Sequence, residues 1–189
     1  MVQPFNNSVS CTLKEPECQV TNHLYTGETK LTGINNFDCG NEIINKFVRR
    51  NLKAKGKAST SAVYVLLDGA KLVGFYTVSA HSLSRDKYDL NELFGNAPKN
   101  VPVIKLDMLG VDLAYQKQKF GQELIALAME NTASVAKAIG CHGMYLDADR
   151  NAVKFYEKLG FKALDEPDPV YETTPMFLHL NSILDALRT

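Results

Sequence analysis

Apolar and polar positions along residues 62–80, the sequence AVYVLLDGAKLVGFYTVSA, predict two adjacent strands. β-branched and aromatic residues stand on both sides of Asp68-Gly69, a dipeptide that tolerates the positive φ of a tight turn. We therefore predict an antiparallel hairpin in this part of the chain. Residues 103–111 add a third apolar, strand-like run.

Helical spacing follows this third strand. Apolar residues recur at intervals of three, four or their multiples from Phe120, which predicts a helix that ends at Gly140. An earlier helix is predicted over residues 41–54, with Asp38 as a candidate cap. Farther along, we predict a strand at 143–148, a helix at 150–159, strands at 161–164 and 176–180, and a short terminal helix.

The order of these elements predicts a mixed α/β sheet with a crossover helix. The 189 residues, 45% of them hydrophobic, suit one domain with a sizeable core. Residues 1–30 mix polar and scattered apolar positions, so we expect an irregular arm or a weak first strand, followed by one domain over residues 31–189. The polar run 81–101 is expected to be a long connection with a short helix at 90–94.

Charge and cysteine content exclude several classes of protein. Lys+Arg 21 against Asp+Glu 21 gives a net charge of +0 and no whole-chain signal for nucleic acid. The four cysteines form no C-x-x-C pair and no zinc-like spacing, and no signal peptide is evident. Apolar runs stay far below the ~18 residues of a membrane span. We expect a cytoplasmic protein with reduced thiols and no metal.

The loop QKQKFG, residues 116–121, joins the third strand to the long helix. Backbone N–H groups at a helix start lack intrahelical partners and carry partial positive charge, so such a loop suits phosphate groups. Lys117 and Lys119 add charge, Gln116 adds donors, and Gly121 permits close approach of a ligand. The alternative is a solvated lysine-rich helix start with a glycine that serves packing.

A second segment, NAVKFYEKLGF, follows at residues 151–161. Together the two segments resemble the GNAT family of N-acetyltransferases, in which a [QR]-x-x-G-x-[GA] loop binds acetyl-CoA. Gln116 and Gly121 match the ends of the loop pattern, but Lys119 replaces its middle glycine. A positive φ there would strain the lysine by on the order of 1 kcal/mol. The second motif is matched by Asn151, Phe155, Tyr156, Gly160 and Phe161.

The resemblance implies a GNAT fold, a mixed twisted sheet of six to seven strands with flanking helices. It also implies acetyl-CoA as co-substrate without a metal. The residues that it assigns to acetyl-CoA binding are Leu109, Gly110, Val111, Gln116, Lys117, Gln118, Lys119, Phe120, Gly121, Gln122, Asn151 and Phe155.

More of the chain, from about residue 37 to 180, looks like the acetyltransferase toxins of type II toxin–antitoxin systems. The segment most specific to these toxins is FDCGNEIINKFVRR. The resemblance implies acetylation of the α-amine of aminoacyl-tRNA, a ribbon-helix-helix antitoxin and a homodimer. These toxins commonly carry GRLAVD where this chain has DMLGVD, with Met108 in place of arginine. That difference leaves open a GNAT enzyme for a small amine or a protein N-terminus, and Lys119 leaves open a non-catalytic protein.

Acetyl transfer needs a proton for the leaving thiolate, and the resemblance points to Tyr156 as the general acid. A phenol titrates near 10, above a thiol near 8.5, so it stays protonated at neutral pH. The alternative is a core tyrosine packed beside Phe155 with its hydroxyl satisfied. His81 and Asp107 are candidate bases, although an α-amine near 7.7–8.0 needs only a weak one.

Residues 46–57, KFVRRNLKAKGK, hold six basic and no acidic side chains. Such clustering suits an RNA backbone, and a solvated helix face is the alternative. The candidate RNA-binding residues are Lys46, Arg49, Arg50, Lys53, Lys55, Lys57 and, in the long connection, Arg85.

Overall fold

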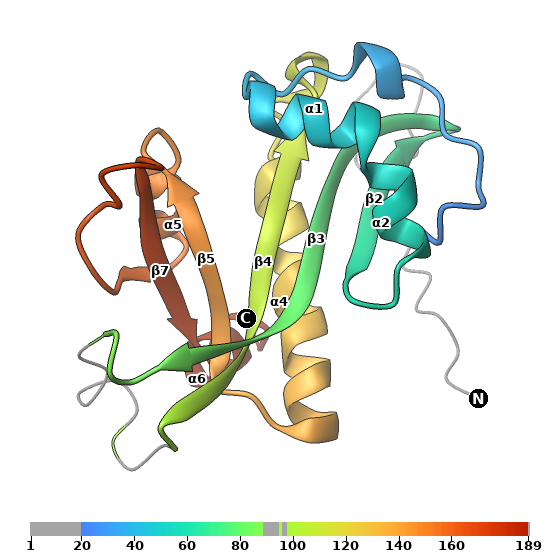
Figure 1. Cartoon of the computed structure of the whole chain (residues 1–189). Helices are drawn as coiled ribbons and strands as arrows, with labels where there is room; N and C mark the ends of the chain where they lie inside the picture. Colours follow the sequence, from blue (N-terminus) through green and yellow to red (C-terminus); the bar gives the residue numbers. More distant parts are fainter. Residues whose placement is uncertain (1–19, 89–94, 96–97, 189) are drawn as a thin grey trace. The chain divides into compact units, whose positions relative to one another are not determined.

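The computed structural model describes residues 20–88, 95 and 98–188 (Figure 1). The described residues form one seven-stranded mixed sheet with the strand order β1-β2-β3-β4-β5-β7-β6. The strands are β1 (Val20–Leu24), β2 (Ala62–Asp68), β3 (Lys71–Ser84), β4 (Asn100–Val111), β5 (Gly143–Asp149), β6 (Lys162–Ala163) and β7 (Thr173–His179). This sheet confirms the predicted fold class.

The strand pairing explains the connections along the chain. β2 and β3 form the predicted antiparallel hairpin, and Gly69 adopts φ 59° at its turn. β4 and β5 are parallel, so the chain must cross over between them, and the long helix α4 (Phe120–Ile139) makes this connection. Its last residue precedes Gly140, which has φ 81° as expected for a residue that ends a helix.

For residues 1–30 the sequence left open an irregular arm or a weak first strand. β1 pairs antiparallel with β2, so residues 20–24 form that first strand. Residues 1–19 and the helix predicted at 90–94 lie outside the described residues. β3 continues to Ser84 and β4 starts at Asn100, which shortens the expected connection at both ends.

The helix predicted over 41–54 is in fact two helices, α1 (Glu42–Arg50) and α2 (Leu52–Lys57). Asn51 lies between them with φ −118° and ψ −21°, outside ideal helical values. Asp38 was wrongly predicted as the cap of α1. The cap is Asn41, whose Oδ1 accepts from the N–H groups of Ile43 at 3.0 Å and Ile44 at 3.2 Å.

Contacts divide the chain into two compact units. Unit 1 comprises the described residues up to Val78 together with Met108–Ile125. Unit 2 comprises the described parts of Ser79–Asp107 and Ala126–Thr189, and includes α5 (Val153–Lys158) and α6 (Leu180–Ala186). β3, β4 and α4 contribute to both units.

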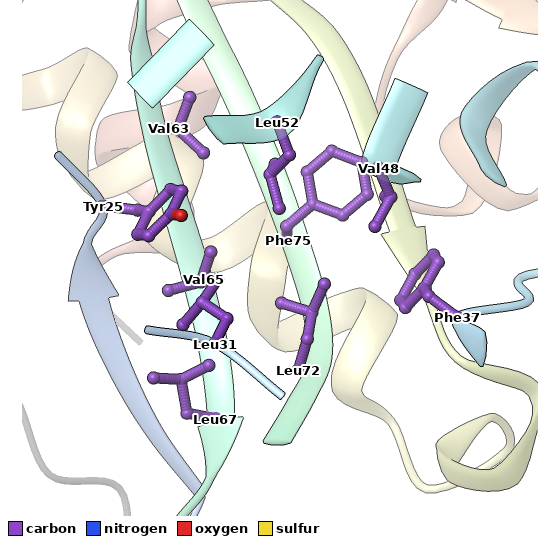
Figure 2. Close-up of a cluster of buried hydrophobic side chains, with 10 residues drawn as sticks. All are labelled: Tyr25, Leu31, Phe37, Val48, Leu52, Val63, Val65, Leu67, Leu72 and Phe75. Atoms are coloured by element: carbon purple, nitrogen blue, oxygen red, sulfur yellow. The ribbon is translucent and has the colours of Figure 1, made fainter. Parts of the chain in front are cut away.

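The core of unit 1 joins the hairpin to α1 and α2. Figure 2 shows Phe75 of β3 among apolar side chains from β2, from both helices and from the segment before them. The Phe75 ring lies 5.9 Å from Phe37 edge to face and 5.8 Å from Phe47 in a stacked arrangement. Val48 and Leu52 are buried on the helices. This packing fixes the segment between Phe37 and α1.

The core of unit 2 lies over β4, β5 and β7. Its buried side chains are Leu83, Tyr88, Val101, Val103, Tyr145 and Phe177. β5 pairs antiparallel with β7 over its full length, from Gly143 opposite His179 to Asp149 opposite Thr173. This pairing orders the end of β5, from which the chain enters α5.

Candidate active site

A hydrogen-bond network in unit 1 holds the segment before α1. Asp38 Oδ1 accepts from the Gly40 N–H at 2.9 Å and from Asn45 Nδ2 at 2.8 Å. Asn45 Oδ1 in turn accepts from the Cys39 N–H at 2.9 Å. The Gly40 and Asn45 donors lower the pKa of Asp38, so its carboxylate stays charged. Asn45 is buried on α1, and the network therefore ties that helix to the D-C-G segment.

The same segment binds the loop that follows β4. Gln116 Nε2 donates to the Cys39 carbonyl at 3.1 Å and to the Val111 carbonyl at 2.9 Å. The Leu113 N–H donates to the Asp38 carbonyl at 2.7 Å. The amide nitrogen of Gln116 is thus engaged by backbone carbonyls, which gives this side chain a positioning role in the loop.

Further contacts anchor both ends of the loop. Asp112 Oδ1 caps the short 3-10 helix Leu113–Tyr115 by accepting from the Ala114 N–H at 3.0 Å. Tyr115 donates from its hydroxyl to Asp68 Oδ2 at 3.1 Å, and its ring lies 6.3 Å from that of the buried Phe120. Sequence reasoning missed these anchors. The partner of the Tyr115 hydroxyl, Asp68, lies 47 residues away along the chain, and nothing in the local pattern indicates it.

Lys117 and Lys119 occupy the left-handed region of backbone space, with φ 63° and φ 68°. Non-glycine residues in this conformation are strained, and such strain gathers at functional sites. The structure therefore selects the strained alternative for the lysine that replaces the loop glycine. Both lysine side chains are exposed.

α4 begins directly after these lysines. The Lys119 carbonyl accepts the Glu123 N–H at 3.1 Å, so the intervening N–H groups lie at the helix start and have no intrahelical partners. Gln118 and Gln122 are exposed, and Gly121 is half-buried. Unpaired N–H groups beside two cationic side chains form an arrangement suited to a phosphate group.

The end of β4 leads into this loop. The pairing of β4 with β5 runs from Ile104 to Leu106, and Leu109, Gly110 and Val111 lie beyond it. A Cβ on Gly110 would lie 3.0 Å from Ile44 Cγ2, so a side chain at this position would crowd α1. Gly110 and Val111 are buried, and Leu109 is half-buried.

Tyr156 lies on α5 in unit 2. Its ring is 8% exposed and makes edge contacts with Phe155 at 5.2 Å and Phe161 at 5.5 Å. Burial raises the pKa of Tyr156 to about 12, so the phenol stays protonated at neutral pH. Its hydroxyl has no hydrogen-bond partner among the described residues. A ligand can therefore use that proton without breaking a bond within the protein.

Asn151 shapes the turn from β5 into α5. Its N–H and its Nδ2 donate to Asp149 Oδ1 at 2.9 and 3.0 Å, and the residue is exposed. Phe155, one turn later, is half-buried. These two residues lie in unit 2, whereas the predicted acetyl-CoA residues of β4 and its loop lie in unit 1.

The basic cluster lies on the two short helices of unit 1. Lys46, Arg49 and Arg50 share one face of α1, and Arg49 forms an ion pair with Glu42. The α2 residues are Lys53, Lys55 and Lys57, of which Lys55 is half-buried and the others are exposed. Arg85 belongs to unit 2 and is half-buried.

The two candidate bases differ in their surroundings. His81 lies within β3 and is exposed, whereas sequence reasoning placed it after the hairpin. Asp107 Oδ1 accepts from Ser79 Oγ at 3.1 Å, and its Oδ2 is buried. No group of three metal-ligating side chains occurs in the described part of the chain. Within that part, no helix combines the length and apolar character needed to span a membrane.

The Acetyltransferase (GNAT) domain model matches residues 59–163, more than half of the chain. The chain belongs to the GNAT family of acetyltransferases. This membership confirms the predicted family and fold, and it identifies the chain as an acetyltransferase.

Relatives of the chain include toxins. The "Probable toxin TacT" of Sinorhizobium fredii is 28% identical over 141 residues, which cover 68% of this chain and 77% of TacT. A structure described as a bacterial toxin is 36% identical with a TM-score of 0.85, and the match covers 89% of this chain and 95% of that one.

AtaT is a third relative, known in several complexes. AtaT with acetyl-methionyl-tRNAfMet is 26% identical with a TM-score of 0.78, and the match covers 90% of this chain and 99% of that one. A tyrosine-to-phenylalanine mutant of AtaT was solved with acetyl-CoA and the C-terminus of the antitoxin AtaR, with a TM-score of 0.76.

Proposed function

We propose that this acetyltransferase transfers acetyl from acetyl-CoA to the α-amine of aminoacyl-tRNA and thereby acts as a translation-blocking toxin. The similarity to AtaT, whose structure contains an acetylated aminoacyl-tRNA, carries this proposal. The toxin TacT and the 36% identical bacterial toxin support the same role.

The loop at the start of α4 is the proposed diphosphate site of acetyl-CoA. The exposed side chains of Lys117 and Lys119 and the N–H groups at the helix start supply positive charge and donors. Gln116 would hold the loop in shape through its two backbone carbonyl partners. The N–H groups at residues 109–111 are the proposed contacts for the pantetheine and the thioester carbonyl.

Tyr156 is the proposed general acid. Its buried ring and its unpartnered hydroxyl support this role, and its pKa of about 12 keeps the phenol protonated at neutral and moderately alkaline pH. One structure of AtaT with acetyl-CoA is that of a tyrosine-to-phenylalanine mutant, which agrees with a tyrosine of importance in a relative.

The basic residues of α1 and α2 are the proposed RNA contact. Lys46, Arg50, Lys53 and Lys57 are exposed, and phosphate contacts of this kind supply most of the affinity for RNA. We also propose a ribbon-helix-helix antitoxin as partner and a homodimer as the assembly. AtaT supports the antitoxin, since it was solved with the C-terminus of AtaR.

Mass spectrometry of bulk aminoacyl-tRNA incubated with the purified chain and acetyl-CoA tests the proposal. The expected product is N-acetyl-aminoacyl-tRNA, and Tyr156→Phe should lose about 10²-fold in rate. Tyr25→Phe is the matched control, because Tyr25 is also a buried tyrosine but belongs to the core of unit 1. It should keep the wild-type rate.

Two outcomes would contradict the proposal. If the chain binds acetyl-CoA but leaves every aminoacyl-tRNA unmodified while it acetylates small amines or peptide N-termini, it is a GNAT enzyme of another substrate class. If expression of the active enzyme without an antitoxin leaves growth and protein synthesis unchanged, the toxin role falls.

A further inference from the structure

A polar cavity of about 890 Å³ lies entirely within unit 2. Its walls come from β3, β4, β5 and β7 and from the turn before β7. Asp165, Glu166 and Asp168 of that turn bring three carboxylates to the cavity, and Asp147 of β5 brings a fourth. An excess of carboxylates over its two lysines, Lys87 and Lys105, suits a ligand with a positively charged amine.

Two buried tyrosines and an exposed ion pair line one wall of the cavity. Tyr145 is 4% exposed, and its hydroxyl donates to Asp147 Oδ1 and lies 3.4 Å from the Tyr88 hydroxyl. Lys105 Nζ donates to Asp147 Oδ2 at 2.7 Å and lies 5.4 Å from the centre of the Tyr145 ring. Each of these groups fixes the next, so the site is preorganised before any ligand enters.

His81 is stacked on this wall. Its ring lies 5.5 Å from the Tyr145 ring with an angle of 17° between the planes. His23 and His179 use a ring nitrogen in a hydrogen bond, but neither ring nitrogen of His81 has such a partner among the described residues. His81 is therefore held in place by its face and keeps both nitrogens available to a ligand in the cavity.

Partial burial favours the neutral form of His81. Desolvation lowers the pKa of His81, and the nearby Lys105 and Lys87 act in the same direction against Asp147 and Asp107. At neutral pH the imidazole can thus accept a proton. Asp107, the other candidate base, is bonded to Ser79 and does not line the cavity.

We propose that this cavity receives the α-amino end of the acceptor substrate and that His81 takes the proton of the attacking amine. The inference rests on the proposed function and names the acceptor side of that reaction. The amine nitrogen attacks the thioester carbonyl carbon and becomes a strongly acidic ammonium as the N–C bond forms. His81 accepts that proton, the C–S bond breaks, and the thiolate takes the Tyr156 proton. Exchange with solvent then returns His81 to its neutral form and Tyr156 to its protonated form.

The test compares His81→Phe with the wild type in acetylation of aminoacyl-tRNA and of α-amino acid methyl esters. Phenylalanine keeps a ring to stack on Tyr145 but has no nitrogen to accept a proton. We expect kcat to fall about 10²-fold with unchanged affinity for acetyl-CoA. The remaining rate should increase with hydroxide concentration, and this increase should continue to a higher pH than in the wild type. His23→Phe, in unit 1, is the control and should match the wild type.

A second measurement follows the ring ¹⁵N signals of His81 during titration with methionine methyl ester in the presence of CoA, which cannot react. Shifts confined to His81 support the cavity as the amine site, whereas unchanged signals overturn it. If the wild type acetylates aminoacyl-tRNA and His81→Phe keeps kcat and its pH profile, the role of His81 is refuted while the proposed function stands. If the wild type acetylates neither substrate, the proposed function falls first.

Discussion

Replacing Lys119 by glycine should make the protein more stable and bind acetyl-CoA more weakly. Lys119 has φ 68°, a conformation that costs a non-glycine residue about 1–2 kcal/mol. Glycine removes that strain but makes the unfolded chain more flexible, which costs about 0.4–1 kcal/mol. The net gain in the free energy of unfolding should be about 0.5–1 kcal/mol. For a chain of this size, each kcal/mol raises Tm by about 2–4 °C.

The loss of affinity has a separate cause. An exposed charge at a helix start contributes about 0.3–1 kcal/mol toward an anion, so removal of the Lys119 ammonium should raise the Kd for acetyl-CoA about two- to fivefold at low salt. Lys119→Ala separates the two effects, because alanine loses the charge but keeps the strain. It should bind acetyl-CoA as weakly as the glycine variant while its stability stays close to that of the wild type.

Urea unfolding measures the stability, and calorimetric titration measures the affinity. S-acetylpantetheine, which lacks the phosphates, should bind all three proteins equally. If Lys119→Gly is no more stable than Lys119→Ala, the argument from backbone strain is refuted. If acetylpantetheine also binds more weakly to the variants, the lysine does not act through the phosphates.

Four further predictions concern other parts of the chain. Because burial raises the pKa of Tyr156 to about 12, the rate of the wild type should show no loss from phenol ionisation up to pH 10, and an alkaline limb below that pH would contradict its role. The same raised pKa stabilises the fold below pH 10, and this contribution should be lost between pH 10 and 12. Urea unfolding of the wild type and of Tyr156→Phe across this pH range measures the loss. Asn45→Ala should lower the free energy of unfolding by about 1–3 kcal/mol and raise the KM for acetyl-CoA, since it leaves the half-buried Cys39 N–H and the Asp38 carboxylate short of a partner. Lys53→Glu should weaken tRNA binding and reduce its salt dependence, whereas Lys162→Glu, an exposed lysine of unit 2, should not.

The elements with strong periodicity were predictable from the sequence. The hairpin around Asp68-Gly69 and the helix from Phe120 to Gly140 carry their own signals, a turn dipeptide in one case and apolar spacing in the other. The weaker elements depend on partners elsewhere in the chain. β1 has five residues and exists as a strand through its pairing with β2, and Pro175 obscured the start of β7 because a proline argues against a central strand.

The residue types of the candidate site could be read from the sequence, but their contacts could not. The segment D-C-G-N, residues 38–41, resembles the toxin sequences, but it does not indicate what these residues bind. The structure supplies the answer, since the Cys39 carbonyl accepts from Gln116, 77 residues farther along the chain. Likewise His81 was one of two candidate bases, and the structure distinguishes them, since His81 stacks on Tyr145 and lines the cavity whereas Asp107 is bonded to Ser79 outside it. Contacts of this kind join distant positions, and no local pattern encodes them.

The loop conformation at Lys119 follows from the same kind of contact. A sequence with lysine in place of glycine would locally favour negative φ, yet both Lys117 and Lys119 are left-handed. The loop is fixed before these lysines by Gln116 and Tyr115 and after them by the buried Phe120. With both ends fixed, few backbone conformations can join them. The contacts outside the loop therefore offset the strain at the two lysines. The positive φ that a glycine would adopt at position 119 without strain is therefore imposed on Lys119 by the tertiary structure, which leaves this position free to carry a charge.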